Sequence, residues 1–227
     1  MGTGSAILAS GERYPDALIA SGLAYGGMQG ACPAGGPLPL FLSPPDRLPP
    51  SVADDIESLG IQQVVVMGGA AVIGDDVKSD LRARGLRLAE YGGRTRYETV
   101  HVFQELLRNP WVGGYEGTTV LLARPDGFAD ALAAAPVAGR GSFPLLLAES
   151  TTALGEMPRG DITGGRERFF FTNGELIGGL AAVSDGVRAE VLQALKAQVG
   201  FGRGTTTWDP HPPPPPTPWP PPPPSWP

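Results

Sequence analysis

The sequence predicts an α/β protein built from two tandem units, each with a mainly parallel sheet. Short apolar runs bounded by Gly and Pro alternate along the chain with segments of helical periodicity. Near-continuous apolar strands that alternate with helices are typical of a parallel sheet covered on both faces. Several segments recur later in the chain in the same order, and the chain ends in a proline-rich stretch.

The apolar runs give the expected strands. They are 5–9, 38–42, 62–67, 118–123, 143–147 and 167–172. Helical patterns cover 50–59 and 96–109, with an N-terminal signal and a following Gly in the first of them. The counterpart of 50–59 in the second unit, residues 151–165, has poor helical periodicity.

An internal repeat sets the expected domain organisation. The segment AILASGERYPDALIASGLA (6–24) resembles VLLARPDGFADALAAAPVA (120–138), and VVVMGGAAVIGDDV (64–77) resembles FFFTNGELIGGLAAVSDGV (169–187). Each copy reads as a small three-layer, Rossmann- or Toprim-like unit, the first over 1–91 and the second, degenerate one over 92–203. Helix 96–109 should open the second unit. Nothing equivalent precedes the first strand, so the first unit lacks its opening helix.

The missing helix leads to a prediction about assembly. Parallel sheets normally have both faces buried, so an incomplete first unit should leave one face of its sheet uncovered. We therefore expect self-association through the regions 1–30 and 92–110.

Composition excludes several classes of protein. The chain has 227 residues, a net charge of −6 and a pI near 4.9, which argues against a nucleic-acid partner. Its apolar runs are far shorter than a membrane span. The start has neither the basic region nor the apolar core of a signal peptide. Cys32 is the only cysteine, so no intrachain disulfide is expected.

The proline-rich tail covers residues 204–227 and holds 13 of the 26 prolines. Proline has no backbone donor and a fixed φ, so this stretch should extend as polyproline II. It reads either as a spacer or as a docking segment. Trp208, Trp219 and Trp226 favour docking because exposed tryptophans are costly.

The glycine pair Gly68–Gly69 follows the apolar run VVVM and raises the question of a phosphate-binding loop. The dinucleotide pattern G-x-G-x-x-G is absent, and no Gly-Lys-Ser/Thr ends a P-loop. We interpret the pair as a tight strand-to-helix turn that needs a positive φ. In the second copy we place this turn at Asn173 and Gly174.

Asp16 and Asp130 occupy equivalent positions, 114 residues apart, each at the start of a helix. A carboxylate there satisfies free N–H groups and complements the helix dipole. A structural cap is the favoured interpretation, with ligand contact or acid–base catalysis as the alternatives.

The catalytic inventory is thin. The chain has two histidines and one cysteine without metal-ligand spacing, and no Gly-x-Ser-x-Gly elbow. We therefore expect no catalytic residue, no metal and no cofactor.

The motif GGRTRYETV (92–100) is the candidate binding site. Arg94 and Arg96 precede or open a helix, with Tyr97 and Thr99 close by, and forked arginine donors suit an anionic group. Alternatively, Arg96 pairs with a local acid and Tyr97 packs between the units.

These motifs together resemble the type 2 cell-wall-binding repeat of Gram-positive surface proteins. The resemblance rests on GRTRYETV, LASGERYPDALIASGLA, PLPLFL and VVVMGGAAVIGDDVKSDL, and it spans roughly residues 5–199. Val100 stands where the family has alanine. The resemblance implies repeats that pack around a pseudo-threefold axis and a non-catalytic attachment to anionic wall polysaccharide, with basic residues at the clefts between repeats. It also implies a place at the cell surface.

Two alternatives from other classes stay open. One is a structural subunit of an extracellular filament or phage virion, with the tail contacting a neighbouring subunit. The other is a small α/β hydrolase, for which the convergent acid–base set is not found in the sequence.

Overall fold

Two parallel sheets organise the computed structural model, which describes residues 4–26, 37–107, 118–141, 143–164 and 171–199. The strands are β1 (Ser5–Ser10), β2 (Leu40–Ser43), β3 (Gln63–Met67), β4 (Arg87–Tyr91), β5 (Thr119–Ala123), β6 (Leu145–Leu147) and β7 (Asn173–Leu176). The helices are α1 (Tyr14–Gly26), α2 (Pro50–Ser58), α3 (Asp75–Ala83), α4 (Arg96–Leu107), α5 (Phe128–Gly141), α6 (Glu156–Thr163) and α7 (Asp185–Val199).

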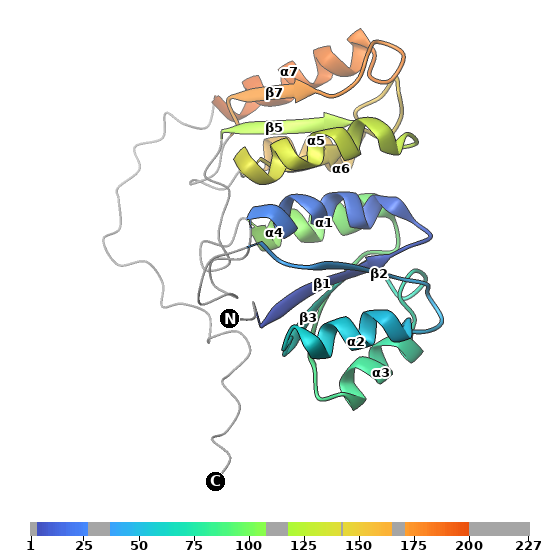
Figure 1. The fold of residues 1–227 in the computed structure, drawn as a ribbon. Coiled ribbons are helices and arrows are strands. Elements are labelled where there is room, and N and C mark those ends of the chain that lie inside the picture. Colours follow the sequence, from blue (N-terminus) through green and yellow to red (C-terminus); the bar gives the residue numbers. More distant parts are fainter. Residues whose placement is uncertain (1–3, 27–36, 108–117, 142, 165–170, 200–227) are drawn as a thin grey trace, which may run out of the picture.

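The sheet topology repeats between the two halves (Figure 1). The N-terminal sheet has the order β2-β1-β3-β4, and the C-terminal sheet has the order β6-β5-β7, with every pairing parallel. We call the first sheet with α1–α4 the N-terminal unit and the second sheet with α5–α7 the C-terminal unit. The predicted fold class, α/β with two parallel-sheet units, is confirmed.

Alternating residues of the central strands divide the N-terminal unit into two cores. Ile7 of β1 and Val65 of β3 pack with α1, α4 and much of the C-terminal unit. Leu8 and Val66, their chain neighbours, pack with α2 and α3 on the opposite face. Because both faces are covered, every residue of β1 and β3 is buried, and all are apolar except Ser5, Ser10 and Gln63 at the strand ends.

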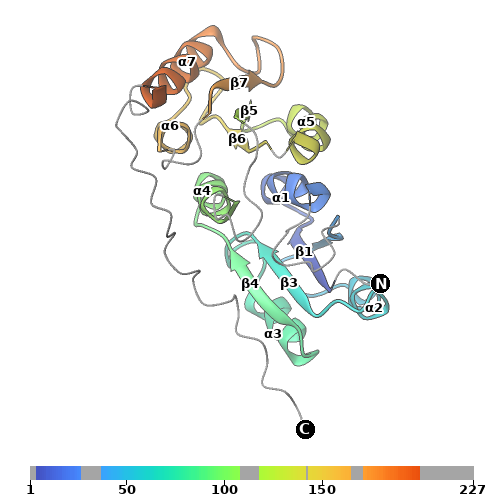
Figure 2. The same ribbon diagram turned by 90° about the vertical axis from the view of Figure 1, so that its left-hand side faces the viewer.

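The prediction of an uncovered sheet face is wrong. Helix α4 does not simply open the second unit: it lies with α1 on one face of the N-terminal sheet, where Val100 and Phe103 enter the core (Figure 2). Its other side packs against α6 and β6 of the C-terminal unit. No helix precedes β1 in the described chain, but α1 and α4 together bury the face. The argument for self-association from an uncovered sheet face therefore has no basis.

Three local elements differ from the expectation. Strand β4 was not expected, because it is an edge strand with Arg87 and Glu90 and has no continuous apolar run. Strand β7 begins at Asn173, beyond the expected 167–172. The poorly periodic segment after β6 forms α6, whose Pro158 and Ile162 are buried.

The units meet through α1 and α5, which lie side by side and run in the same direction. Tyr14 and Phe128, at the starts of the two helices, have ring centroids 5.7 Å apart. Near the other ends, a side chain added at Gly22 would lie 3.6 Å from Ala138 Cβ. Small residues therefore let the two helix backbones approach closely.

Candidate functional site

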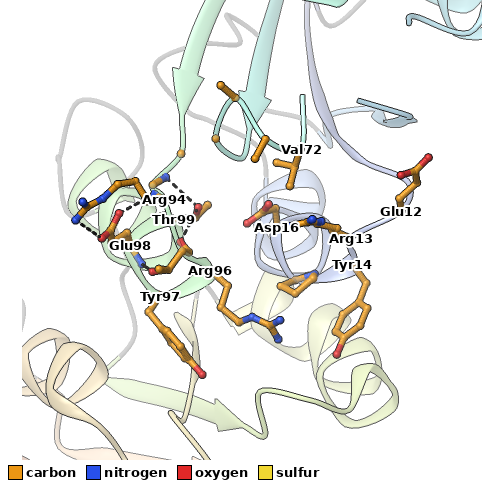
Figure 3. A pocket seen from close by; sticks show the side chains of 17 residues that line it. Glu12, Arg13, Tyr14, Asp16, Val72, Arg94, Arg96, Tyr97, Glu98 and Thr99 are labelled. Atoms are coloured by element: carbon orange, nitrogen blue, oxygen red, sulfur yellow. Dashed lines mark hydrogen bonds and ion pairs between the residues drawn. The ribbon is translucent and has the colours of Figure 1, made fainter. Parts of the chain in front are cut away.

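A pocket of about 950 Å³ opens at the carboxyl ends of β1, β3 and β4 (Figure 3). Its walls are the loop and first turn after β1 (12–16), the turn after β3 (69–72) and the segment after β4 (92–99). In open parallel sheets, ligands bind beside the carboxyl ends of the strands. The predicted residues Arg94, Arg96, Tyr97 and Thr99 all line this pocket.

Glycines let two walls of the pocket touch. Gly68 has φ +115°, so the turn after β3 uses the left-handed region that the sequence predicted for it. A side chain at Gly92 would lie 2.2 Å from the carbonyl carbon of Gly68, and one at Gly69 would lie 2.5 Å from the Gly93 oxygen. The two loops can meet only without side chains at these positions.

The segment 93–99 is held by its own hydrogen bonds. The Gly93 amide donates to Thr99 Oγ1 at 3.0 Å, and the Arg94 amide donates to Glu98 Oε2 at 2.6 Å. The Glu98 amide donates to Thr95 Oγ1 at 3.2 Å, which caps the helix start. This network holds the pocket wall next to the first turn of α4.

Asp16 lies in the first turn of α1, at the floor of the pocket. A side chain at Gly68 would lie 2.8 Å from its Oδ2, so the carboxylate packs directly on the glycine turn. Burial raises the pKa of Asp16, against the opposing effects of a Thr99 hydrogen bond and the charges of Arg96 and Arg13.

Asp130 repeats this arrangement in the C-terminal unit. It lies in the first turn of α5, and a side chain at Gly178 would lie 2.7 Å from its Oδ2. Gly178 has φ +108°, close to that of Gly68. Both aspartates thus stand at helix starts, as predicted, and each also contacts the glycine turn that follows the neighbouring strand.

The placement of the second turn at Gly174 is wrong. Gly174 lies in β7, paired with Val120, and its missing side chain leaves room for Val191 of α7. The turn is at Gly178, 110 residues after Gly68. The apolar run FFF (169–171) suggested a strand at 167–172, whereas β7 begins at Asn173, so the turn after it lies further along the chain.

Two residues of the candidate motif reach the C-terminal unit. Arg96 Nη1 donates to the backbone carbonyl oxygen of Pro125 at 2.5 Å. The Tyr97 hydroxyl donates to the backbone carbonyl oxygen of Glu149 at 3.0 Å. Arg96 therefore hydrogen-bonds a carbonyl of the other unit in place of the local acid considered from the sequence. Burial raises the pKa of Tyr97, with the Arg96 charge opposing it.

Arg94 is a strongly exposed cation of the motif. Its side chain is 92% exposed and lies 3.2 Å from Glu98 Oε1. An exposed ion pair of this kind contributes little stability. A ligand anion can therefore replace Glu98 as the partner of Arg94 at low cost.

Arg13 is a pocket residue that the sequence reasoning missed. It is exposed at the start of α1, lines the pocket, and forms no ion pair within the described part of the chain. Its position in GERYPDAL (11–18), directly after the first strand, could have identified it, because ligands of parallel sheets bind beside the ends of the strands. The second copy has Gly127 at the equivalent position, so Arg13 is not part of the repeated pattern.

Other predicted features fall outside the described residues. These are Trp208, Trp219 and Trp226 of the tail, together with Cys32 and His211. Within the described ranges, no group of three His, Cys, Asp or Glu side chains is placed to hold a metal ion. No helix in those ranges is long and apolar enough for a membrane span.

The described chain thus combines two repeated α/β units with a pocket at the strand ends. The family comparison agrees: residues 90–188 match cell wall binding domain 2 (CWB2). This part of the chain is similar to that family, and the resemblance inferred from the motifs is confirmed. Residues 90–188 thus match a cell wall binding domain, and a family of this kind implies the cell surface.

Two curated relatives come from Bacillus subtilis (strain 168). The chain is 24% identical over 150 residues to N-acetylmuramoyl-L-alanine amidase LytC, covering 65% of this chain and 27% of LytC. It is 31% identical over 111 residues to the amidase enhancer, covering 49% of this chain and 15% of that protein. The chain therefore spans about a quarter or less of these relatives.

Two solved structures share the fold. Cwp6 from Clostridium difficile aligns with a TM-score of 0.71 at 18% identity, covering 85% of this chain and 28% of Cwp6. Cwp8 from the same organism aligns with a TM-score of 0.66 at 20% identity, covering 86% of this chain and 30% of Cwp8.

Proposed function

We propose that this chain attaches non-catalytically to an anionic cell-wall polysaccharide, and that the pocket beside α4 contacts the polymer. The observation that carries the proposal is the placement of Arg13 and Arg94, two exposed cations on opposite walls of one pocket, in a chain with a cell wall binding domain. Guanidinium groups bind carboxylates and phosphates through forked hydrogen bonds.

The residues around these cations fit a saccharide. Glu12 and Asp16 lie on the pocket wall that carries Arg13, and their carboxylates can accept hydrogen bonds from sugar hydroxyls. Tyr14 of the same wall adds an aromatic surface. Arg96, Tyr97 and Thr99 belong to the same site. Arg96 brings a third positive charge that no described carboxylate pairs within ion-pair distance.

The test is co-sedimentation of the full chain with purified Bacillus subtilis cell walls at several salt concentrations. The double variant Arg13→Ala/Arg94→Ala should be retained at least tenfold less at low salt, and wild-type retention should fall with salt because exposed charge contacts are screened. Arg47→Ala/Arg84→Ala is the matched control, since both arginines are exposed and lie outside the pocket. Equal retention of the two double variants would rule out the pocket as the contact site.

Self-association is a second candidate role, and one observation favours it. Leu18 of α1 is 7% exposed, whereas Leu132, its equivalent on α5, is 52% exposed. Phe128 and Leu132 lie one turn apart on α5 and are both more than half exposed, so they form an apolar patch that a further copy can cover.

Light scattering of the full chain tests this role. Association at micromolar concentration that Leu132→Asp abolishes supports it. A wild-type chain that stays monomeric under those conditions rejects it. The wall-attachment proposal stands or falls separately, because Leu132 lies outside the pocket.

A further inference from the structure

We infer that α4 couples the pocket to the junction between the two units, and that Tyr97 is the positioning residue of this coupling. The inference rests on the proposed function for the meaning of the pocket, but its structural part can be tested without a ligand. Tyr97 holds the first turn of α4 against the C-terminal unit and thereby sets the wall at 92–99.

The first turn of α4 has two tasks at once. Its residues from Thr95 to Thr99 line the pocket of the N-terminal unit. From the same turn, Arg96 and Tyr97 donate hydrogen bonds to two separate loops of the C-terminal unit, one after β5 and one after β6. Figure 3 shows the Tyr97 side chain pointing away from Asp16, whereas the Arg96 side chain extends toward the start of α1. A shift between the units must therefore move this pocket wall.

The rest of α4 is fixed to the same neighbour. One turn after Tyr97, His101 Nδ1 lies 2.6 Å from Asp161 Oδ1 of α6. Val100 and Phe103 are buried in the core that α1 shares with the C-terminal unit. The helix is therefore a rigid connection along its described length.

The pocket residues that precede α4 are tied to its first turn by short-range hydrogen bonds. Thr99 Oγ1 holds the Gly93 amide, and Glu98 Oε2 holds the Arg94 amide, so the backbone before the helix is tied to its first turn. Arg94, the exposed cation, is part of this segment. The Tyr97 hydroxyl is already bonded to the Glu149 carbonyl, which leaves its effect on the pocket indirect.

The variant Tyr97→Phe removes only the hydroxyl and keeps the ring, and amide hydrogen exchange of the full chain is the measurement. Losing one hydrogen bond of ordinary strength should speed exchange over 92–99 by roughly two- to tenfold. Tyr25→Phe, at an exposed tyrosine of α1 outside the pocket, is the matched control and should leave this segment unchanged. Urea unfolding of both variants checks that each remains folded.

Wall retention supplies the second readout. Tyr97→Phe should lower retention several-fold without changing how steeply it falls with salt, because no charge is lost. Arg13→Ala should flatten the salt dependence and leave exchange over 92–99 unchanged. If exchange over 92–99 is the same in Tyr97→Phe and Tyr25→Phe, the coupling is refuted. If the wild-type chain does not bind walls, the proposed function falls, while the exchange result still decides the coupling.

Discussion

Helices α1 and α5 are equivalent in sequence and in fold, yet they meet different surroundings. Both begin with an aromatic residue, carry an aspartate in the first turn and follow the central strand of a sheet. Leu18 of α1 is buried in the core that the two units share, whereas its equivalent on α5, Leu132, is half-exposed. The same motif therefore gives the same scaffold, and the neighbouring segments decide which copy forms a site.

The pocket illustrates this difference. In the N-terminal unit the turn at Gly68, the start of α1 and the segment after β4 enclose it. The C-terminal unit has the matching turn at Gly178 and the matching Asp130. Among the described residues it has no counterpart of β4 or of the arginine motif that follows it. The pocket of the N-terminal unit is thus built with the helix that leads into the next unit.

The largest expected effect separates Leu18 from Leu132. Leu18→Ala should lower the free energy of unfolding by about 3 kcal/mol, because it removes a buried side chain from the junction. Leu132→Ala should cost less than about 1 kcal/mol, since half of that side chain already contacts water. Urea denaturation of the two variants gives both numbers. Similar losses would contradict the difference between the two faces.

The glycine turns should behave alike in both units. Gly68→Ala places Cβ 2.4 Å from Val72 Cγ2, and Gly178→Ala places it 2.8 Å from Ala182 Cβ. Each should cost about 2 kcal/mol in unfolding free energy. Gly60→Ala is the matched control, with φ +64° and open space, and should cost about 1 kcal/mol. A Gly68 variant no less stable than the Gly60 variant would argue against close packing of Asp16 on the turn.

The smallest expected effect concerns pH. Because burial raises the pKa of Asp16, the folded chain binds a proton there more readily than the unfolded chain. This contribution to stability is present below the ordinary aspartate pKa and is lost as pH rises through the raised value. Acidification from pH 7 to about 4 should therefore favour wild type relative to Asp16→Asn, by less than about 1 kcal/mol.

Unfolding of wild type and Asp16→Asn at both pH values measures this change. Asp130→Asn is the matched substitution at the equivalent position. A wild-type advantage that is independent of pH would show that Asp16 does not gain stability from its proton.

The sequence was sufficient for the fold class because the central strands β1, β3 and β5 each contain a nearly continuous apolar run. It was insufficient for β4, a charged edge strand in which Glu90 forms an ion pair with Lys78 of α3. It also misplaced the second turn, because periodicity shows that a strand exists but not where it begins. The role of α4 in covering the first sheet depends on packing between distant segments, which no local pattern encodes.

The site was predictable in part. The motif 92–99 does line the pocket, and the aspartates do stand at helix starts. Arg13 was missed because it is absent from the second copy. The hydrogen bonds of Arg96 and Tyr97 to the other unit join residues 29 and 52 positions apart. At that separation the sequence alone could not decide between a ligand-binding and a structural role for the two residues.

Amide-exchange footprinting of the full chain on purified Bacillus subtilis walls tests the central claim most directly. It compares the pocket with its equivalent in the other unit within one experiment. Protection on walls should appear over 12–16 and 92–99 and be absent over 126–130 and 178–182. Protection confined to the C-terminal segments, or a bound chain with no protection at the pocket, would contradict the assignment of wall attachment to the site beside α4.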